Sequence, residues 1–164
     1  GATVVTNPVA NLKLAVGGVF PYPGARKRDL ALGLGTDGPG SNNSLDMFEQ
    51  MKFFALIQKH TAADPTMAPA GDVWRIAIGA ASPLVGANGK LSAGEPADFL
   101  LLRTDVPELG LGDLTADLVY AASGSGVVDT TVVAGKVLMK GGQVRGVDEI
   151  RERVVERAKR LGIG

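Results

Sequence analysis

The sequence contains no cysteine and a single histidine among its 164 residues. The absence of cysteine excludes disulfide bonds, thiolate metal sites and cysteine nucleophiles, and it favours a cytoplasmic protein. A Ser-His-Asp triad would have to use the one histidine, His60. A zinc site with two or three histidine ligands cannot be built from this chain alone.

An excess of charge of one sign is also missing, because 17 Lys and Arg balance 17 Asp and Glu. A net charge of zero gives no electrostatic footprint for nucleic acid or for an anionic membrane. No apolar run approaches ~20 residues, and no charged segment followed by an apolar one opens the chain. We therefore expect neither a signal peptide nor a membrane span, and no nucleic-acid or membrane partner.

Two apolar segments near the start predict strands, at residues 2–6 and 29–36. Strands without polar alternation are usually buried on both faces, as in parallel sheets covered by helices. Asn7-Pro8 predicts a turn after the first strand, and a Gly- and Pro-rich passage follows it. Because two such strands cannot bury their own faces, we interpret the first ~60 residues as part of a larger sheet.

Apolar residues recur at helical spacing in two segments that follow. The first runs from Phe48 to about His60, and either Asn43 or Ser44 is a plausible cap, or Asp46 with Glu49 in a capping-box variant. The second helix, at 73–80, should end at Pro83 and place Trp74 in the core.

The pattern then changes to an antiparallel meander. Strands are predicted at 98–103, 127–133 and 136–139, with tight turns at 134–135 and 141–142. The final segment, 148–161, predicts a helix with one apolar face. On another face, Glu149 with Arg153 and Glu156 with Arg160 are spaced for ion pairs.

The most informative stretch is residues 32–38, an apolar strand that runs through glycines into Asp37. In α/β barrels the carboxyl ends of the strands form the rim that carries the active site. The glycines allow close approach of a ligand, and Gly38 is free to take a positive φ. Two simpler interpretations stay open: Asp37 as a turn or capping residue, and a Gly-x-Gly-x-x-Gly nucleotide-binding string from Gly33.

Several longer strings resemble the amidohydrolase superfamily. They are residues 7–14 (NPVANLKL), 34–38 (LGTDG), 41–49 (SNNSLDMFE), 58–60 with 64–65, 94–98 and 133–136. The most similar branch is that of the S-adenosylhomocysteine and methylthioadenosine deaminases, which also contains the triazine chlorohydrolases. The resemblance extends along essentially the whole chain and corresponds to the C-terminal portion of the family's fold.

That resemblance implies an α/β fold made of the last two strand–helix units of a (β/α)8 TIM barrel, followed by the C-terminal part of a small β-sandwich and a terminal helix. The strand at Thr3–Thr6 then corresponds to barrel strand seven, and Leu30–Thr36 to strand eight. The expected ranges are 1–90 for the barrel part, 91–146 for the sandwich part and 147–164 for the helix.

The resemblance further implies that Asp37 is a catalytic carboxylate and a ligand of one divalent metal, zinc by default, with iron or manganese as alternatives. The family's histidine ligands lie on strands that this sequence lacks. Asn11, Ser41 and Asn42 are candidates for substrate binding, although each also suits a purely structural role in a loop or a helix cap. His60 is expected to be structural.

Two departures from the family pattern affect the expected substrate. Where the family often has His and Ser, this chain has Thr6 and Ala10. We expect hydrolysis of a C–N or related bond, most simply deamination of a nitrogen heterocycle by metal-activated water. The expected partners are a small-molecule substrate and an N-terminal barrel polypeptide that carries the histidines, in a higher oligomer. The alternative is a non-catalytic scaffold derived from a barrel.

Overall fold

The computed structural model describes residues 2–80, 89–110 and 112–163. Contacts within the chain divide it into two compact units. The first comprises Gly1–Glu95 and Arg103–Val127, and the second comprises Pro96–Leu102 and Val128–Gly164. Each unit is described separately below.

The first unit contains a parallel pair of strands, β1 (Thr3–Thr6) and β2 (Ala31–Leu34). Thr3 lies opposite Ala31 and Thr6 opposite Leu34. Both strands were predicted from their apolar composition, and both are shorter than predicted. Because the strands are parallel, their carboxyl ends lie at the same edge of the sheet.

The passage between the strands contains two short helices, where the sequence predicted only a turn at Asn7-Pro8 and no helix. Helix α1 spans Pro8–Leu14 and α2 spans Tyr22–Lys27. Each has a proline in its first two positions. A proline there presets the helical φ and its missing N–H costs no hydrogen bond, so these prolines favour helix starts.

The segment after β2 forms the single-turn helix α3 (Pro39–Asn42) and the long helix α4 (Met47–Ala62). The cap of α4 is Asp46, whose Oδ1 accepts from the Phe48 N–H at 2.9 Å. Asn43 instead ends α3 in the left-handed conformation, with a φ of 69°. The Asp46 N–H donates to the Ser44 hydroxyl at 3.2 Å, which takes the place of the bond from Glu49 that a capping box would have.

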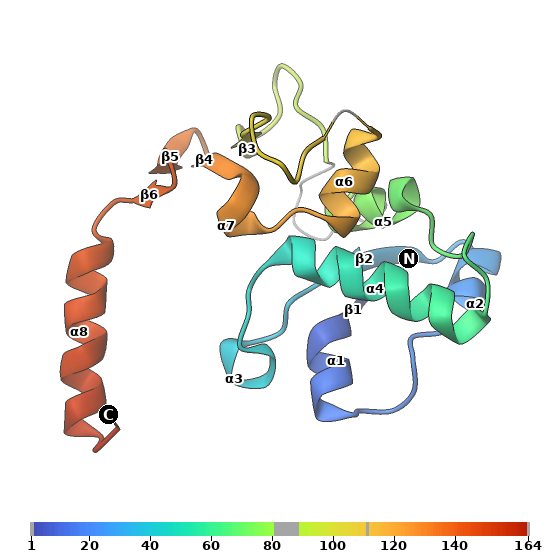
Figure 1. The fold of residues 1–164 in the computed structure, drawn as a ribbon, viewed down its shortest axis with the longest axis horizontal. Helices are drawn as coiled ribbons and strands as arrows, with labels where there is room; N and C mark the ends of the chain where they lie inside the picture. Colours follow the sequence, from blue (N-terminus) through green and yellow to red (C-terminus); the bar gives the residue numbers. More distant parts are fainter. Residues whose placement is uncertain (1, 81–88, 111, 164) are drawn as a thin grey trace. The chain divides into compact units, whose positions relative to one another are not determined.

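Three further helices complete the first unit: α5 (Ala70–Ala77), α6 (Leu114–Tyr120) and α7 (Gly124–Val127). The predicted end of α5 at Pro83 lies outside the described residues. Helix α4 packs against α1, α5 and α6 and also contacts β2. In Figure 1, α4 crosses in front of the β1–β2 pair, with α5 and α6 above it and α1 below it.

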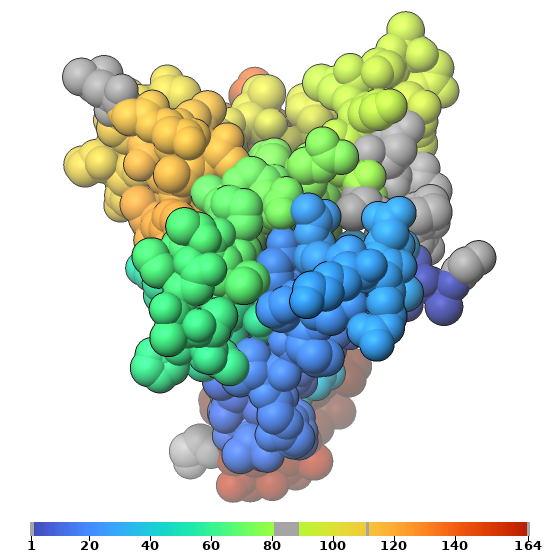
Figure 2. Space-filling view, turned by 90° about the vertical axis from the view of Figure 1, so that its right-hand side faces the viewer, coloured from blue at the N-terminus to red at the C-terminus, as the bar shows by residue number. Residues whose placement is uncertain are grey.

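The core of the first unit lies around α4. Its most deeply buried large side chains are Phe54, Met51, Gln50, Val73, Val119 and Val127. The space-filling view shows the blue residues of the α1–α2 region in direct contact with the green residues of α4 and α5 (Figure 2). Trp74, which was expected in the core, is only half-buried.

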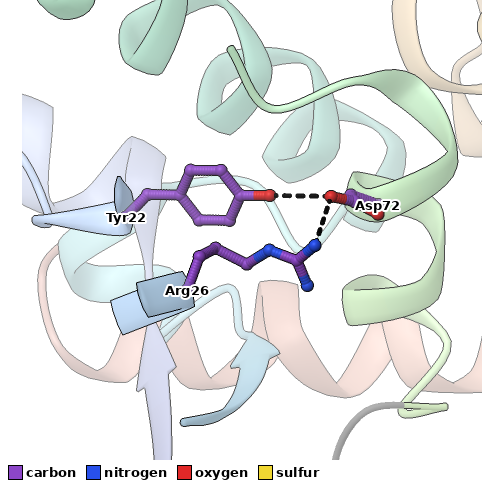
Figure 3. Close-up of polar contacts among 3 residues, drawn as sticks. All are labelled: Tyr22, Arg26 and Asp72. Carbon is purple, nitrogen blue, oxygen red and sulfur yellow. Dashed lines mark hydrogen bonds and ion pairs between the residues drawn. The ribbon is translucent and has the colours of Figure 1, made fainter. Parts of the chain in front are cut away.

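One polar cluster connects α2 to α5. The Tyr22 hydroxyl donates to Asp72 Oδ2 at 3.1 Å, and Arg26 Nη2 lies 3.1 Å from the same oxygen. Both side chains point at the carboxylate from one side, as Figure 3 shows. The Tyr22 ring is 3% exposed and meets Phe54 edge-on at 5.4 Å between ring centroids. Burial, and then the Asp72 charge, raise the pKa of Tyr22 to about 12.

The second unit is an antiparallel sheet of strands β3 (Phe99–Leu102), β4 (Val128–Val133), β5 (Lys136–Lys140) and β6 (Gln143–Val144), in that order. This confirms the predicted meander. The turn residues Ala134, Gly135, Gly141 and Gly142 all have positive φ, as two-residue hairpin turns require.

The compact units divide the chain differently from the ranges expected from sequence. Residues 103–127, expected within the sandwich range 91–146, pack with the first unit and supply α6 and α7. The second unit ends with helix α8 (Val147–Arg160). The assignment of the ranges to a barrel and a sandwich stays a prediction.

Helix α8 carries both predicted ion pairs, Glu149 with Arg153 and Glu156 with Arg160. No residue of α8 is buried, and its apolar residues Ile150 and Val154 are 57% and 60% exposed. Among the described residues, no helix combines the length and the apolar character that crossing a bilayer requires.

Candidate functional site

The site candidates lie where β1 and β2 end. Thr6, the last residue of β1, accepts a hydrogen bond at its carbonyl from the Gly35 N–H at 3.0 Å. The two strands therefore remain in register one residue beyond Leu34, the last residue of β2. The polar residues that follow each strand consequently emerge at the same edge of the sheet.

Gly35 lies directly against the side chain of Asn7 at this edge. An added Cβ at Gly35 would lie 2.4 Å from Asn7 Oδ1 and 3.3 Å from Val5 Cγ1. A carbon cannot approach an oxygen that closely, so any larger residue would displace Asn7. The space left by this glycine, which the sequence suggested for a ligand, is thus occupied by Asn7.

Asp37 adopts a left-handed backbone conformation, with a φ of 59°. Aspartate tolerates this region better than most residues. The sequence suggested a positive φ at Gly38 instead, but Gly38 has a φ of −76°. The turn that presents the carboxylate is therefore formed by the aspartate itself.

The Asp37 carboxylate is exposed and held in an anionic state. Its Oδ1 accepts the Gly38 N–H at 2.6 Å. That backbone hydrogen bond, followed by one from the Ser41 side chain, holds the pKa of Asp37 below its usual value. The side chain is thus ionised at neutral pH, as a metal ligand or a proton acceptor must be.

The two other candidates on this loop point in different directions. The half-buried Ser41 donates its hydroxyl to the Gly38 carbonyl at 3.0 Å. Asn42 is 4% exposed, and its Nδ2 donates to the Thr36 carbonyl at 2.5 Å. The Asn42 Oδ1 is buried without a hydrogen-bond partner among the described residues. Asp37, Ser41 and Asn42 thus share one loop, with Asn42 turned inward.

Asn11 lies on α1, where its Nδ2 approaches the Thr6 hydroxyl at 3.5 Å. Both residues line a cavity of about 300 Å³ between α1, the segment that follows it and α4. The cavity wall is mainly apolar, from Leu12, Val16, Val19, Phe20, Phe54 and Ile57. Asp37, Ser41 and Asn42 are not part of that wall.

Two side chains that sequence reasoning did not single out connect α1, which follows β1, to α3 and α4, which follow β2. Lys13 of α1 donates to Asn43 Oδ1 at the end of α3. Gln50 of α4 is fully buried, and its Oε1 accepts from the Val9 N–H at 3.2 Å. A polar residue in an otherwise apolar helix stripe was the only signal for Gln50.

The metal-binding potential of the described residues is limited. They contain no group of three or more His, Cys, Asp or Glu side chains that could hold a metal ion. His60 is exposed in the last turn of α4, at the opposite end of the helix from the Asp46 cap. Asp37 thus offers one anionic oxygen ligand and not a complete site.

A model of the amidohydrolase family matches residues 1–138. The chain belongs to the amidohydrolase family. It is 40% identical over 166 residues to a 5-methylthioadenosine/S-adenosylhomocysteine deaminase of Archaeoglobus fulgidus, a match that covers 98% of this chain and 39% of that protein. The resemblance to this family and its deaminase branch is thereby confirmed.

Solved structures agree with the α/β fold of the amidohydrolase chain. A Xanthomonas campestris adenosine deaminase with bound zinc matches with a TM-score of 0.82 at 30% identity, over 96% of this chain and 36% of that one. An Arthrobacter aurescens atrazine chlorohydrolase complexed with zinc matches with a TM-score of 0.73 over 97% of this chain and 35% of that one. Its 24% identity shows the fold alone.

The amidohydrolase chain spans little more than a third of these proteins. Its match covers 39% of the Archaeoglobus deaminase and 36% of the Xanthomonas chain.

Proposed function

We propose that this chain forms the C-terminal part of a metal-dependent deaminase and that Asp37 is its catalytic metal ligand. The observation that carries the proposal is the position of Asp37, an exposed, ionised aspartate directly beyond β2 in a chain of the amidohydrolase family. The substrate class we propose is a 6-aminopurine nucleoside, because the relative from Archaeoglobus is named for the deamination of such compounds.

Within the proposed barrel, β1 is strand seven and β2 is strand eight. Their parallel pairing supports this assignment. Among the described residues, neither strand has a second partner strand, as expected if neighbouring barrel strands come from elsewhere. The barrel rim is the carboxyl end of the strands, which is where Asn7 and Asp37 emerge. The four-stranded second unit is the proposed C-terminal part of the sandwich.

Asp37 fits one position of a divalent-metal site. Its Oδ1 already accepts the Gly38 N–H at 2.6 Å, and the carboxylate is exposed. Carboxylate oxygens are accepted by zinc, iron and manganese alike, and we propose zinc because the Xanthomonas adenosine deaminase has it bound. A bound divalent metal lowers the pKa of water and supplies a nucleophile at neutral pH.

The contribution of this chain to catalysis is then proton handling and substrate contact. The ionised Asp37 accepts a proton from the attacking water at the carboxylate oxygen that does not bind Gly38. Ser41 lies four residues beyond Asp37 on the same loop, where its hydroxyl is placed to contact the substrate. Asn11 contacts the substrate from the rim of the cavity beyond β1.

The remaining metal ligands come from outside the described residues. We propose that a polypeptide segment with the first six strand–helix units supplies the histidines, and that the complete barrel is part of a higher oligomer in the cytoplasm. Below, the assembled enzyme means this chain together with that segment. Intact-mass and metal analysis of a native preparation should find both; a folded, metal-free monomer of this chain alone would refute the proposal.

The test of Asp37 is its replacement by Asn in the assembled enzyme. Asp37→Asn keeps the shape but removes the charge and the proton acceptor, so kcat should fall at least ~10²-fold, the usual contribution of a general base. Asp29→Asn is a matched control, because Asp29 also has a left-handed φ of 51° but precedes β2. Unchanged turnover in Asp37→Asn would favour the non-catalytic scaffold.

A further inference from the structure

The loop that presents Asp37 is held on both sides by one residue, Asn42. Its side-chain Nδ2 donates to the carbonyl of Thr36, the residue before Asp37, at 2.5 Å. Its backbone N–H donates to the carbonyl of Gly38, the residue after Asp37, at 3.0 Å. The carbonyls of the two residues on either side of Asp37 are therefore both bonded to the same buried residue.

The two hydrogen bonds that Asn42 donates to the Thr36 and Gly38 carbonyls form a bracket around Asp37. Neither bond involves the Asp37 side chain. The carboxylate bonds forward to the Gly38 N–H, while Asn42 takes only main-chain carbonyls. Asp37 itself has a φ of 59°, a conformation that a non-glycine residue keeps only when its surroundings impose it. The bonds from Asn42 to the neighbouring carbonyls supply that constraint.

The burial of Asn42 separates its role from that of a substrate contact. The residue is 4% exposed, whereas Asp37 is exposed. Its amide orientation is fixed, because only the Nδ2 end can donate to the Thr36 carbonyl. The Oδ1 end consequently remains buried without a partner among the described residues, an arrangement that a simple loop asparagine would avoid by turning to solvent.

We propose that Asn42 is a positioning residue for Asp37: it holds the aspartate turn and thereby sets the carboxylate for metal binding. The inference rests on the proposed function of Asp37 and deepens it. Residues that orient metal ligands through hydrogen bonds typically contribute 10- to 100-fold to metal affinity or activity. Asn42 does not bond to the Asp37 carboxylate itself and would act through the backbone of the loop that carries it.

The test compares Asn42→Leu with Asn43→Gly in the assembled enzyme. Leucine fills a similar volume but cannot donate to Thr36. Asn43 is the exposed neighbour of Asn42, and its left-handed φ of 69° suits glycine. Asn43→Gly removes an asparagine side chain and its bond from Lys13 but leaves both hydrogen bonds of Asn42 in place. Zinc affinity is measured by competition with a chelator, and kcat and KM are measured with saturating zinc.

The expected result is about 10- to 100-fold weaker zinc binding and a lower kcat in Asn42→Leu, with KM within about twofold of the unchanged enzyme. Asn43→Gly should match the unchanged enzyme in all three. A lower melting temperature with unchanged zinc affinity would overturn the inference in favour of a purely structural role. A higher KM with unchanged zinc affinity would overturn it in favour of substrate contact.

Asp37→Asn, measured alongside, distinguishes failure of the proposed function from failure of the positioning role alone. If Asp37→Asn keeps full zinc affinity, the proposed function fails. If Asp37→Asn loses zinc affinity but the Asn42 variant keeps it, only the positioning role fails. Should Asn42→Leu not fold, Asn42→Ser is judged by the same criteria, since serine fits the site and keeps the backbone bond to Gly38 but is too short to reach Thr36 as Asn42 does.

Discussion

At the scale of single residues, the site depends on close contacts between groups that are distant in the sequence. Asn7 lies against Gly35, and Asn42 reaches back to Thr36. The sequence predicted that Asp37 follows an apolar strand, but spacing alone left open whether it is a turn residue or a metal ligand. The inward turn of Asn42 was not predictable, since its partner is a main-chain carbonyl that every residue carries.

Gly35→Ala tests the contact between β2 and the residue after β1. The new Cβ would lie 2.4 Å from Asn7 Oδ1 and 3.3 Å from Val5 Cγ1, so the Asn7 side chain must turn away and the Val5 side chain must give. We expect a loss of about 1–3 kcal/mol in the free energy of unfolding, measured by chemical denaturation of the assembled enzyme. Gly40→Ala is the control, because a Cβ there meets nothing within 4 Å. Equal stability of the two variants would contradict the close packing at Gly35.

At the scale of elements, the Gly- and Pro-rich passage between β1 and β2 is where the sequence predicted no helix and the structure has two. The passage between β1 and β2 contains helices α1 and α2 because its prolines stand at helix starts, a meaning that composition alone does not distinguish from turns. The hairpin turns of the second unit were predictable, since Ala-Gly and Gly-Gly between β-branched runs leave few alternatives. Helix α6 carried a signal that was overlooked: Asp113 caps it by accepting from the Thr115 N–H at 2.9 Å.

The contact between α2 and α5 should contribute measurably to stability. Tyr22→Phe removes the hydrogen bond to Asp72 and leaves the partly exposed carboxylate with Arg26 as its remaining partner in this cluster. We expect a loss of about 1 kcal/mol near pH 8 by chemical denaturation. Tyr120→Phe, on α6, is the control for loss of a tyrosine hydroxyl.

The same variant has a signature at alkaline pH. Because the pKa of Tyr22 is raised to about 12 in the folded chain, the unfolded state loses this proton first, near pH 10. The stabilisation due to Tyr22 is thus complete below pH 10 and decreases as the pH rises to 12. The stability difference between the unchanged enzyme and Tyr22→Phe should shrink over that interval. A difference that grows with pH would refute the assignment of the raised pKa to Tyr22.

At the scale of the whole molecule, the described residues include apolar strands with open edges or exposed faces. Both strands of the first unit lack a second partner strand among the described residues. In the second unit, Leu100, Leu101, Val137 and Leu138 of the sheet are 49–57% exposed. Exposed apolar strands favour association, which supports the proposal that further polypeptide completes the barrel. The need for a further polypeptide, inferred from the histidine count, stays a prediction, and the sequence cannot name the residues that would complete the site.

The most direct measurement is a crystal structure of the assembled enzyme, with anomalous scattering recorded at the zinc absorption edge. If Asp37 is the metal ligand, one of its carboxylate oxygens will lie within about 2.0–2.2 Å of the anomalous peak. The Asn42 Nδ2 will still bond to the Thr36 carbonyl behind it. A zinc ion held elsewhere, with the Asp37 carboxylate bonded only to the Gly38 N–H, would contradict the account.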